Sequence, residues 1–319
     1  MTAAAASLPA DGSGLRVGFL GPEATFGEQA LLTQPDLARG ERVPFGSMPD
    51  VLRATADGTV DVGFVAIENA LEGSVNVTVD TLAFDVDLLI QREVVIPVSM
   101  HLLAVPGASL EDIRTVVSIP VATAQCRAFL QAELPGVVER AVDSTAEAAR
   151  RVAEADDPSV AAIANALAAE VYGLVPLAEE IEDHPDNETR FVAVQADTVP
   201  AQSGHDKSTV VIFQHADRPG SLLAILQEFA ARSINLTRLE SRPTKSGLGN
   251  YCFLVDFEGH VADEVVADCL RSLKAEQSDV KFLGSYPAAG ADGAEVRADV
   301  AAAFRAADEW LSAIRSRIT

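Results

Sequence analysis

The sequence predicts an α/β protein in two parts, and two observations support this. From residue 15 to about residue 196, apolar strand-like runs alternate with amphipathic helix-like segments, which is typical of sheets covered by helices. A polar stretch at 197–206, with proline, glycine and serine, then reads as a linker, and a shorter pattern of strands and helices follows at 207–287. A chain of 319 residues, 48% of them hydrophobic, can bury the cores of two domains.

In the first part, short apolar runs end at turn residues, as buried strands do. The expected strands are residues 15–20, 62–67, 88–96, 116–118, 137–142, 160–164 and 188–195. The expected helices begin at Ser47 or cover residues 79–84, 122–134 and 146–155. Ser47 is followed by proline and aspartate, and Ser144 begins a capping box with Glu147, so both serines mark helix starts.

This alternation predicts parallel sheets, and the late return of the chain predicts two lobes around a cleft. We place residues 15–96 and 180–196 in the first lobe and residues 97–179 in the second. The second part shows the order strand, helix, strand, strand, helix, strand, which is the ferredoxin-like motif. Its strands are expected at 208–213, 235–242, 251–257 and 280–283, and its helices at 221–232 and 262–273.

The two ends of the chain differ from its body. Residues 1–14 are rich in alanine, serine and glycine, without a basic start or a long apolar core, so they predict a disordered tail rather than a signal peptide. Residues 288–319 form a tail in which apolar residues recur at helical spacing, which predicts an amphipathic helix packed on the body. These residues are Val300, Phe304, Leu311, Ile314 and Ile318.

Composition excludes several classes of function. A net charge of −23 argues against a nucleic-acid or anionic-membrane partner. The three cysteines, Cys126, Cys252 and Cys269, lack metal-ligand spacing, and the five histidines are scattered, so we expect no metal site. No apolar run is long enough to span a bilayer. These features predict a cytoplasmic protein.

The strongest candidate site residues stand where two predicted strands begin or end. Thr189 and Arg190 open one strand, while Glu68 and Asn69 end another. A guanidinium binds a carboxylate bidentately, and a threonine hydroxyl can donate to a departing group, so these residues suit a small polyanion. Neighbours on a strand point to opposite faces, so Thr189 and Arg190 share a site only if the strand ends or bends there. The alternative is a surface threonine and a solvated arginine.

Further candidates follow the predicted strands, where ligands of α/β sheets collect. They are Thr25, Gly73, Ser74, Ser118 and Gln125. A helix cap, a turn or an ordinary helix surface is the alternative for each of them, so both interpretations stay open.

In the second part, Gly220, Ser221 and Leu222 stand at a strand-to-helix junction, where backbone amides can bind a carboxylate. Asn235 and Glu240 could meet an ammonium group, and together these features suit an amino acid. The alternative is a turn and an edge strand.

Taken in order, these motifs resemble those of bacterial prephenate dehydratase with a C-terminal ACT regulatory domain, over residues 15–287. The most specific motifs are Thr189-Arg190-Phe191, Glu68-Asn69, Glu72-Gly73-Ser74-Val75 and Glu240-Ser241-Arg242-Pro243. The resemblance implies a catalytic region that is periplasmic-binding-protein-like, with the substrate between its lobes. It implies conversion of prephenate to phenylpyruvate, with loss of carbon dioxide and water and without a cofactor.

The resemblance also implies roles for residues. Thr189, Glu68 and Asn69 would be catalytic. The substrate-binding residues would be Arg190, Phe191, Thr25, Ser118, Gln125, Gly73 and Ser74. L-phenylalanine would bind between paired ACT domains of a homodimer or homotetramer, at Gly220, Ser221, Leu222, Asn235, Leu236, Glu240 and Ser241.

The chain departs from the family pattern at five positions, and two other functions stay open. The departures are Ala24, Gly27, Ala70, Ile119 and Val121. A positive φ at Ala24 would cost roughly 1 kcal/mol, so we expect its loop to differ slightly from the family. The other functions are arogenate dehydratase and a ligand-binding regulator with weak or no turnover.

Overall fold

The computed structural model describes residues 14–214, 219–244, 251–277, 279–289, 309–310 and 312–316. The chain forms two compact units, residues 1–198 and 199–319. Within the described ranges, no helix is long and apolar enough to cross a membrane.

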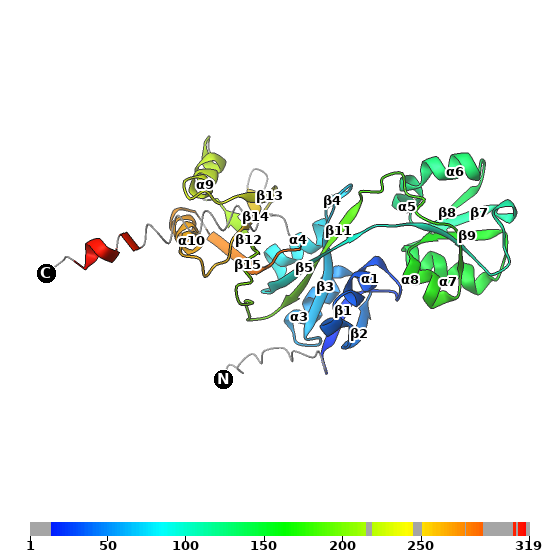
Figure 1. Ribbon diagram of the computed structural model, residues 1–319, viewed down its shortest axis with the longest axis horizontal. Helices are drawn as coiled ribbons and strands as arrows, with labels where there is room; N and C mark the ends of the chain where they lie inside the picture. The colour runs from blue at the N-terminus through cyan, green and yellow to red at the C-terminus, as the bar shows by residue number, and fades with distance from the viewer. Residues whose placement is uncertain are drawn as a thin grey trace. The chain divides into compact units, whose positions relative to one another are not determined.

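The first lobe of the first unit is built on a sheet with strand order β2-β1-β3-β11-β5 (Figure 1). Its strands are β1 (Arg16–Leu20), β2 (Glu41–Phe45), β3 (Val62–Asn69), β5 (Leu89–Pro97) and β11 (Glu188–Gln195), with the short β4 (Gly73–Ser74) paired to the end of β3. Its helices are α1 (Phe26–Leu32), α2 (Pro35–Ala38), α3 (Met48–Ala56), α4 (Asn76–Asp80) and a π-helix (Thr81–Asp85). As predicted, α3 begins at Ser47, whose side chain accepts a hydrogen bond from the amide of Asp50.

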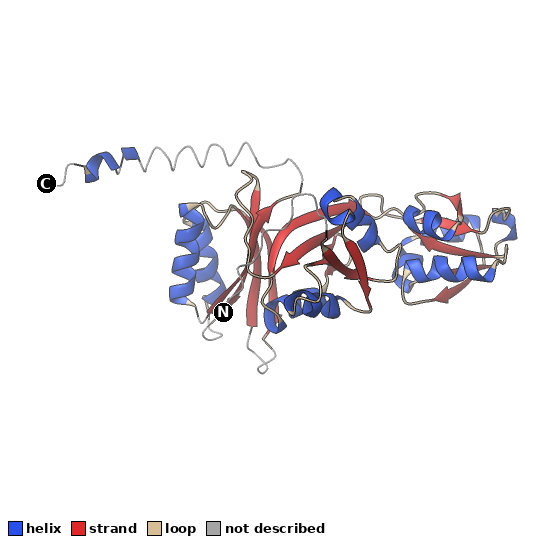
Figure 2. Ribbon diagram, turned by 90° about the horizontal axis from the view of Figure 1, so that it is seen from below, coloured by secondary structure: helices blue, strands red, loops and turns tan. Residues whose placement is uncertain are grey.

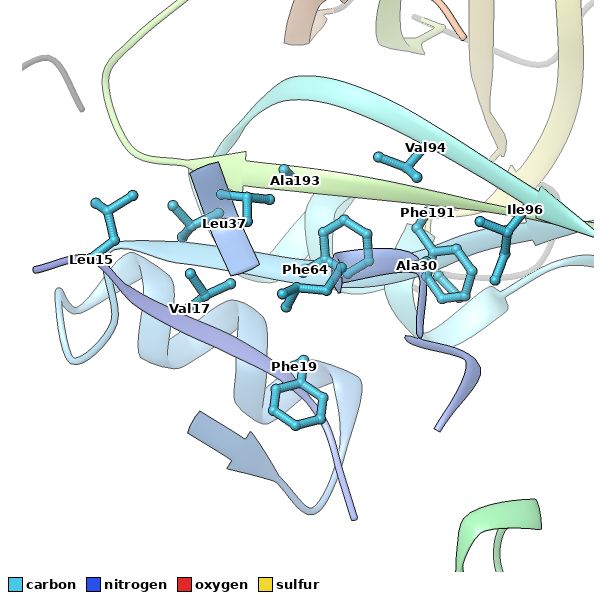
Figure 3. Close-up of a cluster of buried hydrophobic side chains, with 13 residues drawn as sticks. Leu15, Val17, Phe19, Ala30, Leu37, Phe64, Val94, Ile96, Phe191 and Ala193 are labelled. Carbon is cyan, nitrogen blue, oxygen red and sulfur yellow. The ribbon is translucent and has the colours of Figure 1, made fainter. Parts of the chain in front are cut away.

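One buried cluster fixes the position of strand β11, which lies between β3 and β5. Phe191 of β11 stacks on Phe64 of β3, with ring centroids 5.5 Å apart and an interplanar angle of 8°. Figure 3 shows this pair together with Ile96 of β5 and Ala30 of α1. Because β11 returns from the second lobe, it runs antiparallel to both β3 and β5. The prediction of parallel sheets is therefore wrong for this strand.

The second lobe has a sheet with strand order β10-β6-β9-β7-β8. Its strands are β6 (His101–Ala104), β7 (Thr115–Ser118), β8 (Val138–Ala141), β9 (Val160–Ala164) and β10 (Val175–Ala178). Its helices are a 3₁₀ turn (Leu110–Asp112), α5 (Pro120–Gln125), α6 (Arg127–Glu133), α7 (Thr145–Ala155) and α8 (Ala166–Tyr172). This sheet is also mixed, because β6 runs antiparallel to β9 and to β10.

The single helix predicted over residues 122–134 is wrong, because two helices meet there. They meet at Cys126, whose backbone (φ −114°, ψ 22°) leaves the helical region. The Cys126 side chain is fully buried in the core of the lobe. Cys126 therefore ends one helix and begins the next without leaving the core.

The second unit confirms the ferredoxin-like motif. Its elements are β12 (Asp206–Phe213), α9 (Ser221–Ala230), β13 (Leu236–Pro243), β14 (Tyr251–Glu258), α10 (Glu264–Glu276) and β15 (Asp279–Pro287). The sheet is antiparallel, in the order β13-β14-β12-β15, and both helices cover one face (Figure 2). Phe229 of α9 packs on Phe257 of β14 in the core between them.

Most of the two predicted tails lies outside the described residues. This holds for residues 1–13 and for Val300, Phe304, Leu311 and Ile318 of the predicted C-terminal helix. Of its described residues, Trp310 is 66% exposed and Ile314 is 41% exposed. The predicted packing of this helix on the body is not seen at these two residues.

Candidate active site

Thr189 and Asn69 are brought together by the strand ladder of the first lobe. Thr189 lies opposite Asn69 in the antiparallel pairing of β11 with β3. The side-chain nitrogen Nδ2 of Asn69 donates to Oγ1 of Thr189 at 2.9 Å. Two segments 120 residues apart in sequence therefore meet at one hydroxyl group.

The orientation of the Asn69 amide is set by the turn that follows β3. Its oxygen Oδ1 accepts from the backbone amides of Leu71 (3.0 Å) and Glu72 (2.9 Å). Its nitrogen must therefore face Thr189, and the Thr189 oxygen is an acceptor in this bond. The hydroxyl hydrogen of Thr189 is left to be donated to another group.

The hydrogen bonds continue from Asn69 into the second lobe. Nδ2 of Asn69 also donates to Oδ1 of Asn187 (2.9 Å), and Nδ2 of Asn187 donates to Oε1 of Gln125 (3.3 Å). Nε2 of Gln125 donates to Oε1 of Glu72 (3.2 Å). Since the backbone amide of Glu72 donates to Asn69, the four residues close a ring, which we call the amide ring (Asn69, Asn187, Gln125 and Glu72).

A pocket of about 430 Å³ lies between the lobes beside the amide ring. Residues from both lobes line it: Leu71, Glu72, Pro120, Val121, Ala124, Gln125, Asp183 and His184. Thr189 does not line this pocket. Hydrogen bonds through Asn69 and Asn187 connect Thr189 to Gln125, which does line the pocket.

Arg190 points away from Thr189, as alternation along a strand requires. Across β11 and β5, Thr189 is opposite Ile96 and Arg190 is opposite Val95. The Nε atom of Arg190 lies 2.6 Å from Oε2 of Glu93, and its Nη1 lies 3.3 Å from Oε2 of Glu68. Arg190 therefore forms ion pairs with two carboxylates, and Glu68 contacts Arg190 rather than Thr189.

The structure shows internal contacts for the other predicted substrate-binding residues. Thr25 caps α1 by accepting from the amide of Glu28 (3.3 Å), and Oγ of Ser118 donates to the carbonyl of Ile163 (2.8 Å). Phe191 is buried in the core of the first lobe. Gly73 has φ +77°, a conformation that favours glycine. Ser74 of β4 lies opposite Glu68 of β3 in the antiparallel pairing of the two strands.

Ala24 does adopt a positive φ, of 68°, in the loop before Thr25. Its side chain is fully buried and packs in the apolar cluster of the second lobe. Its backbone amide donates to Oε2 of Glu28 at 2.6 Å. These contacts offset the conformational cost that the sequence led us to expect.

Two residues of this region were not predicted as site residues. Asn187 is 2% exposed, lies immediately before β11 and, like Thr189, accepts a hydrogen bond from Nδ2 of Asn69. Glu93 is 6% exposed and stands at the edge of the apolar run 94–96 of β5. Neither carried a clear sequence signal, because Asn187 lies between Asp186 and Glu188, and Glu93 follows Gln91 and Arg92.

No thiol or metal chemistry is indicated in the described part of the chain. Burial raises the pKa of Cys126 to about 12, and the nearby Asp183 and Glu182 act in the same direction, so this thiol is a poor nucleophile. Across the described ranges, no cluster of three or more His, Cys, Asp or Glu side chains could hold a metal ion.

The second unit has a pocket of about 480 Å³ at the start of α9. It is lined by Gln214, Gly220, Ser221, Leu222, Leu223, Leu226 and Phe253. Three of the seven predicted ligand residues thus line it, while Asn235, Leu236, Glu240 and Ser241 do not. Glu240 is paired with Arg242 (2.6 Å) and Arg238 (3.0 Å), so an ammonium group would compete with two guanidinium groups.

These features define a class: a two-lobed α/β enzyme with a site of hydroxyl, amide and carboxylate groups, followed by a ferredoxin-like domain with a small-molecule pocket. A family model described as prephenate dehydratase matches residues 17–199, and one described as ACT domain matches residues 209–275. The chain belongs to the prephenate dehydratase family, with an ACT domain near its C-terminal end. The family assignment, the fold class and the function that the sequence motifs predicted are thereby confirmed.

Two of the following three relatives are described as prephenate dehydratases, and the third carries a different description. The chain is 41% identical to a prephenate dehydratase of Mycobacterium tuberculosis over 292 residues, which is 88% of this chain and 89% of the relative. The crystal structure of a prephenate dehydratase from Arthrobacter aurescens in complex with L-Phe is 39% identical, with a TM-score of 0.83, over 95% of this chain and 100% of that one. A structure of GqqA, described as a novel type of quorum quenching acylase, is 29% identical, with a TM-score of 0.76, over 86% of this chain and 98% of that one.

Proposed function

We propose that Thr189 is the hydrogen-bond donor in the decarboxylating dehydration of prephenate to phenylpyruvate by this enzyme. The observation that carries this role is the direction of the bond between Asn69 and Thr189. Because Asn69 donates to Thr189, the Thr189 hydroxyl has its own hydrogen for the departing ring hydroxyl.

The reaction makes a limited demand on the protein. The bond between the ring and its carboxylate breaks, and its electron pair enters the ring as carbon dioxide leaves. The opposite carbon–oxygen bond breaks, and the departing hydroxide becomes water on taking up a proton. Since the ring becomes aromatic, positioning the substrate and stabilising the leaving oxygen supply most of the catalysis.

Charge near the site bears on which residue binds the substrate carboxylates. Arg190 balances Glu93 and Glu68 and points away from Thr189, so it supports the strand ends rather than binding substrate directly. In this proposal, backbone amides and the second Nε2 hydrogen of Gln125, which lines the pocket between the lobes, are the donors for the substrate carboxylates. Arogenate, which has an amine in place of the keto group, is the alternative substrate.

One assay tests this function. Purified enzyme is given prephenate or arogenate, and formation of phenylpyruvate or phenylalanine is followed. Thr189→Val keeps the shape of the side chain but removes the donor, and loss of one such donor lowers kcat by about 100- to 1,000-fold. Near-normal kcat in the variant would refute the role of Thr189, and tight prephenate binding without turnover by the wild type would favour a ligand-binding regulator.

We also propose that L-phenylalanine regulates the enzyme through the pocket at the start of α9. The amides of Ser221 and Leu222 lie at the N-terminus of this helix, where a carboxylate is stabilised, and Leu222 and Phe253 offer apolar contact for a ring. The relative from Arthrobacter aurescens was solved with L-Phe. In this proposal the cytoplasmic enzyme pairs through its ACT domains into a dimer or tetramer.

Regulation is tested with L-phenylalanine and, as a control, L-alanine, which lacks the ring. L-phenylalanine should change the rate, the thermal stability and the mass measured by light scattering. No change in any of the three would contradict the proposal. The substitution Leu222→Asp should abolish the response while leaving the rate without ligand unchanged.

A further inference from the structure

We propose that Asn187 is a positioning residue, which holds the Asn69 amide so that it donates to Thr189. The inference rests on the proposed role of Thr189 and assigns a function to a residue that does not itself touch the hydroxyl. Asn187 immediately precedes β11, two residues before Thr189, and is 2% exposed.

The backbone of Asn187 is fixed from both sides. Its carbonyl accepts from the amide of Val98 (2.8 Å), and its own amide donates to the carbonyl of His184 (3.2 Å). The side chain therefore projects from a rigid point, and its two polar atoms have different partners. Oδ1 accepts from Asn69 in the first lobe, and Nδ2 donates to Gln125 in the second.

All hydrogen bonds of the amide ring point the same way around it, so each side-chain amide accepts from one neighbour and donates to the next. The direction runs from the backbone amides of Leu71 and Glu72 to Asn69, then to Asn187, then to Gln125, and ends at the Glu72 carboxylate. A reversed Asn187 would place two NH₂ groups against each other at Asn69. Because backbone amides and a carboxylate define the two ends, each side-chain amide in between has only one satisfactory orientation.

This direction matters at Thr189 because Asn69 has two side-chain hydrogens. The two shortest contacts of Nδ2 are to Oδ1 of Asn187 and Oγ1 of Thr189, each at 2.9 Å, and the carbonyl of Glu188 is a third acceptor at 3.2 Å. Without the acceptor on Asn187, the Asn69 amide loses one of the contacts that fix its plane. The Thr189 hydroxyl would then be free to turn, and its hydrogen would no longer be aimed at the leaving group.

Two substitutions separate positioning from packing. Asn187→Asp keeps the acceptor for Asn69 but removes the donor to Gln125. Asn187→Leu keeps the branching at Cγ in a larger apolar side chain and removes both. Loss of positioning in Asn187→Leu should lower kcat about 10- to 100-fold while KM changes less than about threefold. Asn187→Asp should recover at least tenfold of that loss.

Two further measurements make the result decisive. Ser144→Ala removes the cap of α7 and serves as a control, since lower stability alone should leave its kcat at the wild-type value. Hydrogen exchange of the Leu71 and Glu72 amides, which donate to Asn69, should be faster in Asn187→Leu but not in Asn187→Asp. If Asn187→Leu fails to fold, Asn187→Ala removes the acceptor with a smaller residue, and the same pattern is expected.

Either of two results would overturn the inference: wild-type kcat in Asn187→Leu, or equal loss of kcat in both variants. Failure of the proposed function would look different. A wild-type enzyme that does not turn over prephenate refutes the function, and the exchange of the Leu71 and Glu72 amides then decides alone whether Asn187 fixes Asn69. Unchanged exchange in Asn187→Leu would refute the positioning role.

Discussion

Arg190 and Glu93 form a buried ion pair, and we predict that substituting Arg190 lowers the free energy of unfolding more than substituting Glu93. The Glu93 side chain is 0% exposed and that of Arg190 is 10% exposed, and their charged atoms are 2.6 Å apart. At an effective dielectric constant of ~20, this separation corresponds to an attraction of about 6 kcal/mol, which desolvation of the two ions largely offsets. The net value of the pair is therefore small, but removing one partner is costly.

The loss of unfolding free energy depends on which charged side chain remains after the substitution. Arg190→Gln leaves a buried carboxylate without its guanidinium, and such variants lose about 3–5 kcal/mol of unfolding free energy. Glu93→Gln leaves Arg190 with Glu68 at 3.3 Å, so we expect a smaller loss, of about 1–3 kcal/mol. The double variant buries no charge at this position, and it should recover most of the stability lost in Arg190→Gln.

The assay is urea unfolding of the full chain, followed by far-ultraviolet circular dichroism. Asp36→Asn is the matched control, because Asp36 pairs with Arg92 on the same strand β5 at 2.6 Å but is half-buried, and the loss should stay within about 1 kcal/mol. Equal losses in Arg190→Gln and Glu93→Gln, or a double variant as unstable as the sum of both, would refute the reasoning.

Two further predictions concern titrating groups. Hydrogen bonds from Arg150 and Arg151 lower the pKa of Glu147 from 4.5 to about 2, so its stabilising effect is fully present above pH 4.5 and is lost as the pH falls through about 2. Glu147→Gln should lower the melting temperature at pH 7, by the equivalent of less than about 1 kcal/mol for this exposed cluster, and the difference from the wild type should shrink as the pH falls from 4.5 to 2. Burial raises the pKa of Cys126 and of Cys269 to about 12, so a thiol reagent at pH 8 should label neither in the native enzyme and both in urea. Rapid labelling of native enzyme, or an effect of Glu147→Gln that does not depend on pH, would contradict these assignments.

The local parts of the fold could be predicted from the sequence because their causes are local. Ser47 and Ser144 begin helices, since each side chain caps a backbone amide three residues later. The break at Cys126 could not be foreseen, because apolar spacing continues through it. The antiparallel direction of β11 depends on the path of the chain through the second lobe, which periodicity does not report.

The candidate site could also be predicted only in part. Thr189 and Asn69 were candidates because they lie at the ends of predicted strands, and their hydrogen bond follows from the register of β3 with β11. That Glu68 meets Arg190, and that Arg190 meets Glu93, depends on which residues of three strands are opposite each other. Gln125 reaches the amide ring only through tertiary structure, because it lies 62 residues from Asn187 along the chain.

The strand order of the first lobe has a consequence for the order in which the chain can fold. In the sequence β2-β1-β3-β11-β5, strand β5 is joined to the sheet only through β11, which is made about a hundred residues later. During synthesis the second lobe, which is continuous in sequence, can close first, while β5 waits as an unpaired apolar edge. The sheet of the first lobe is completed when Glu188–Gln195 inserts between β3 and β5, and the same step delivers Thr189 to Asn69.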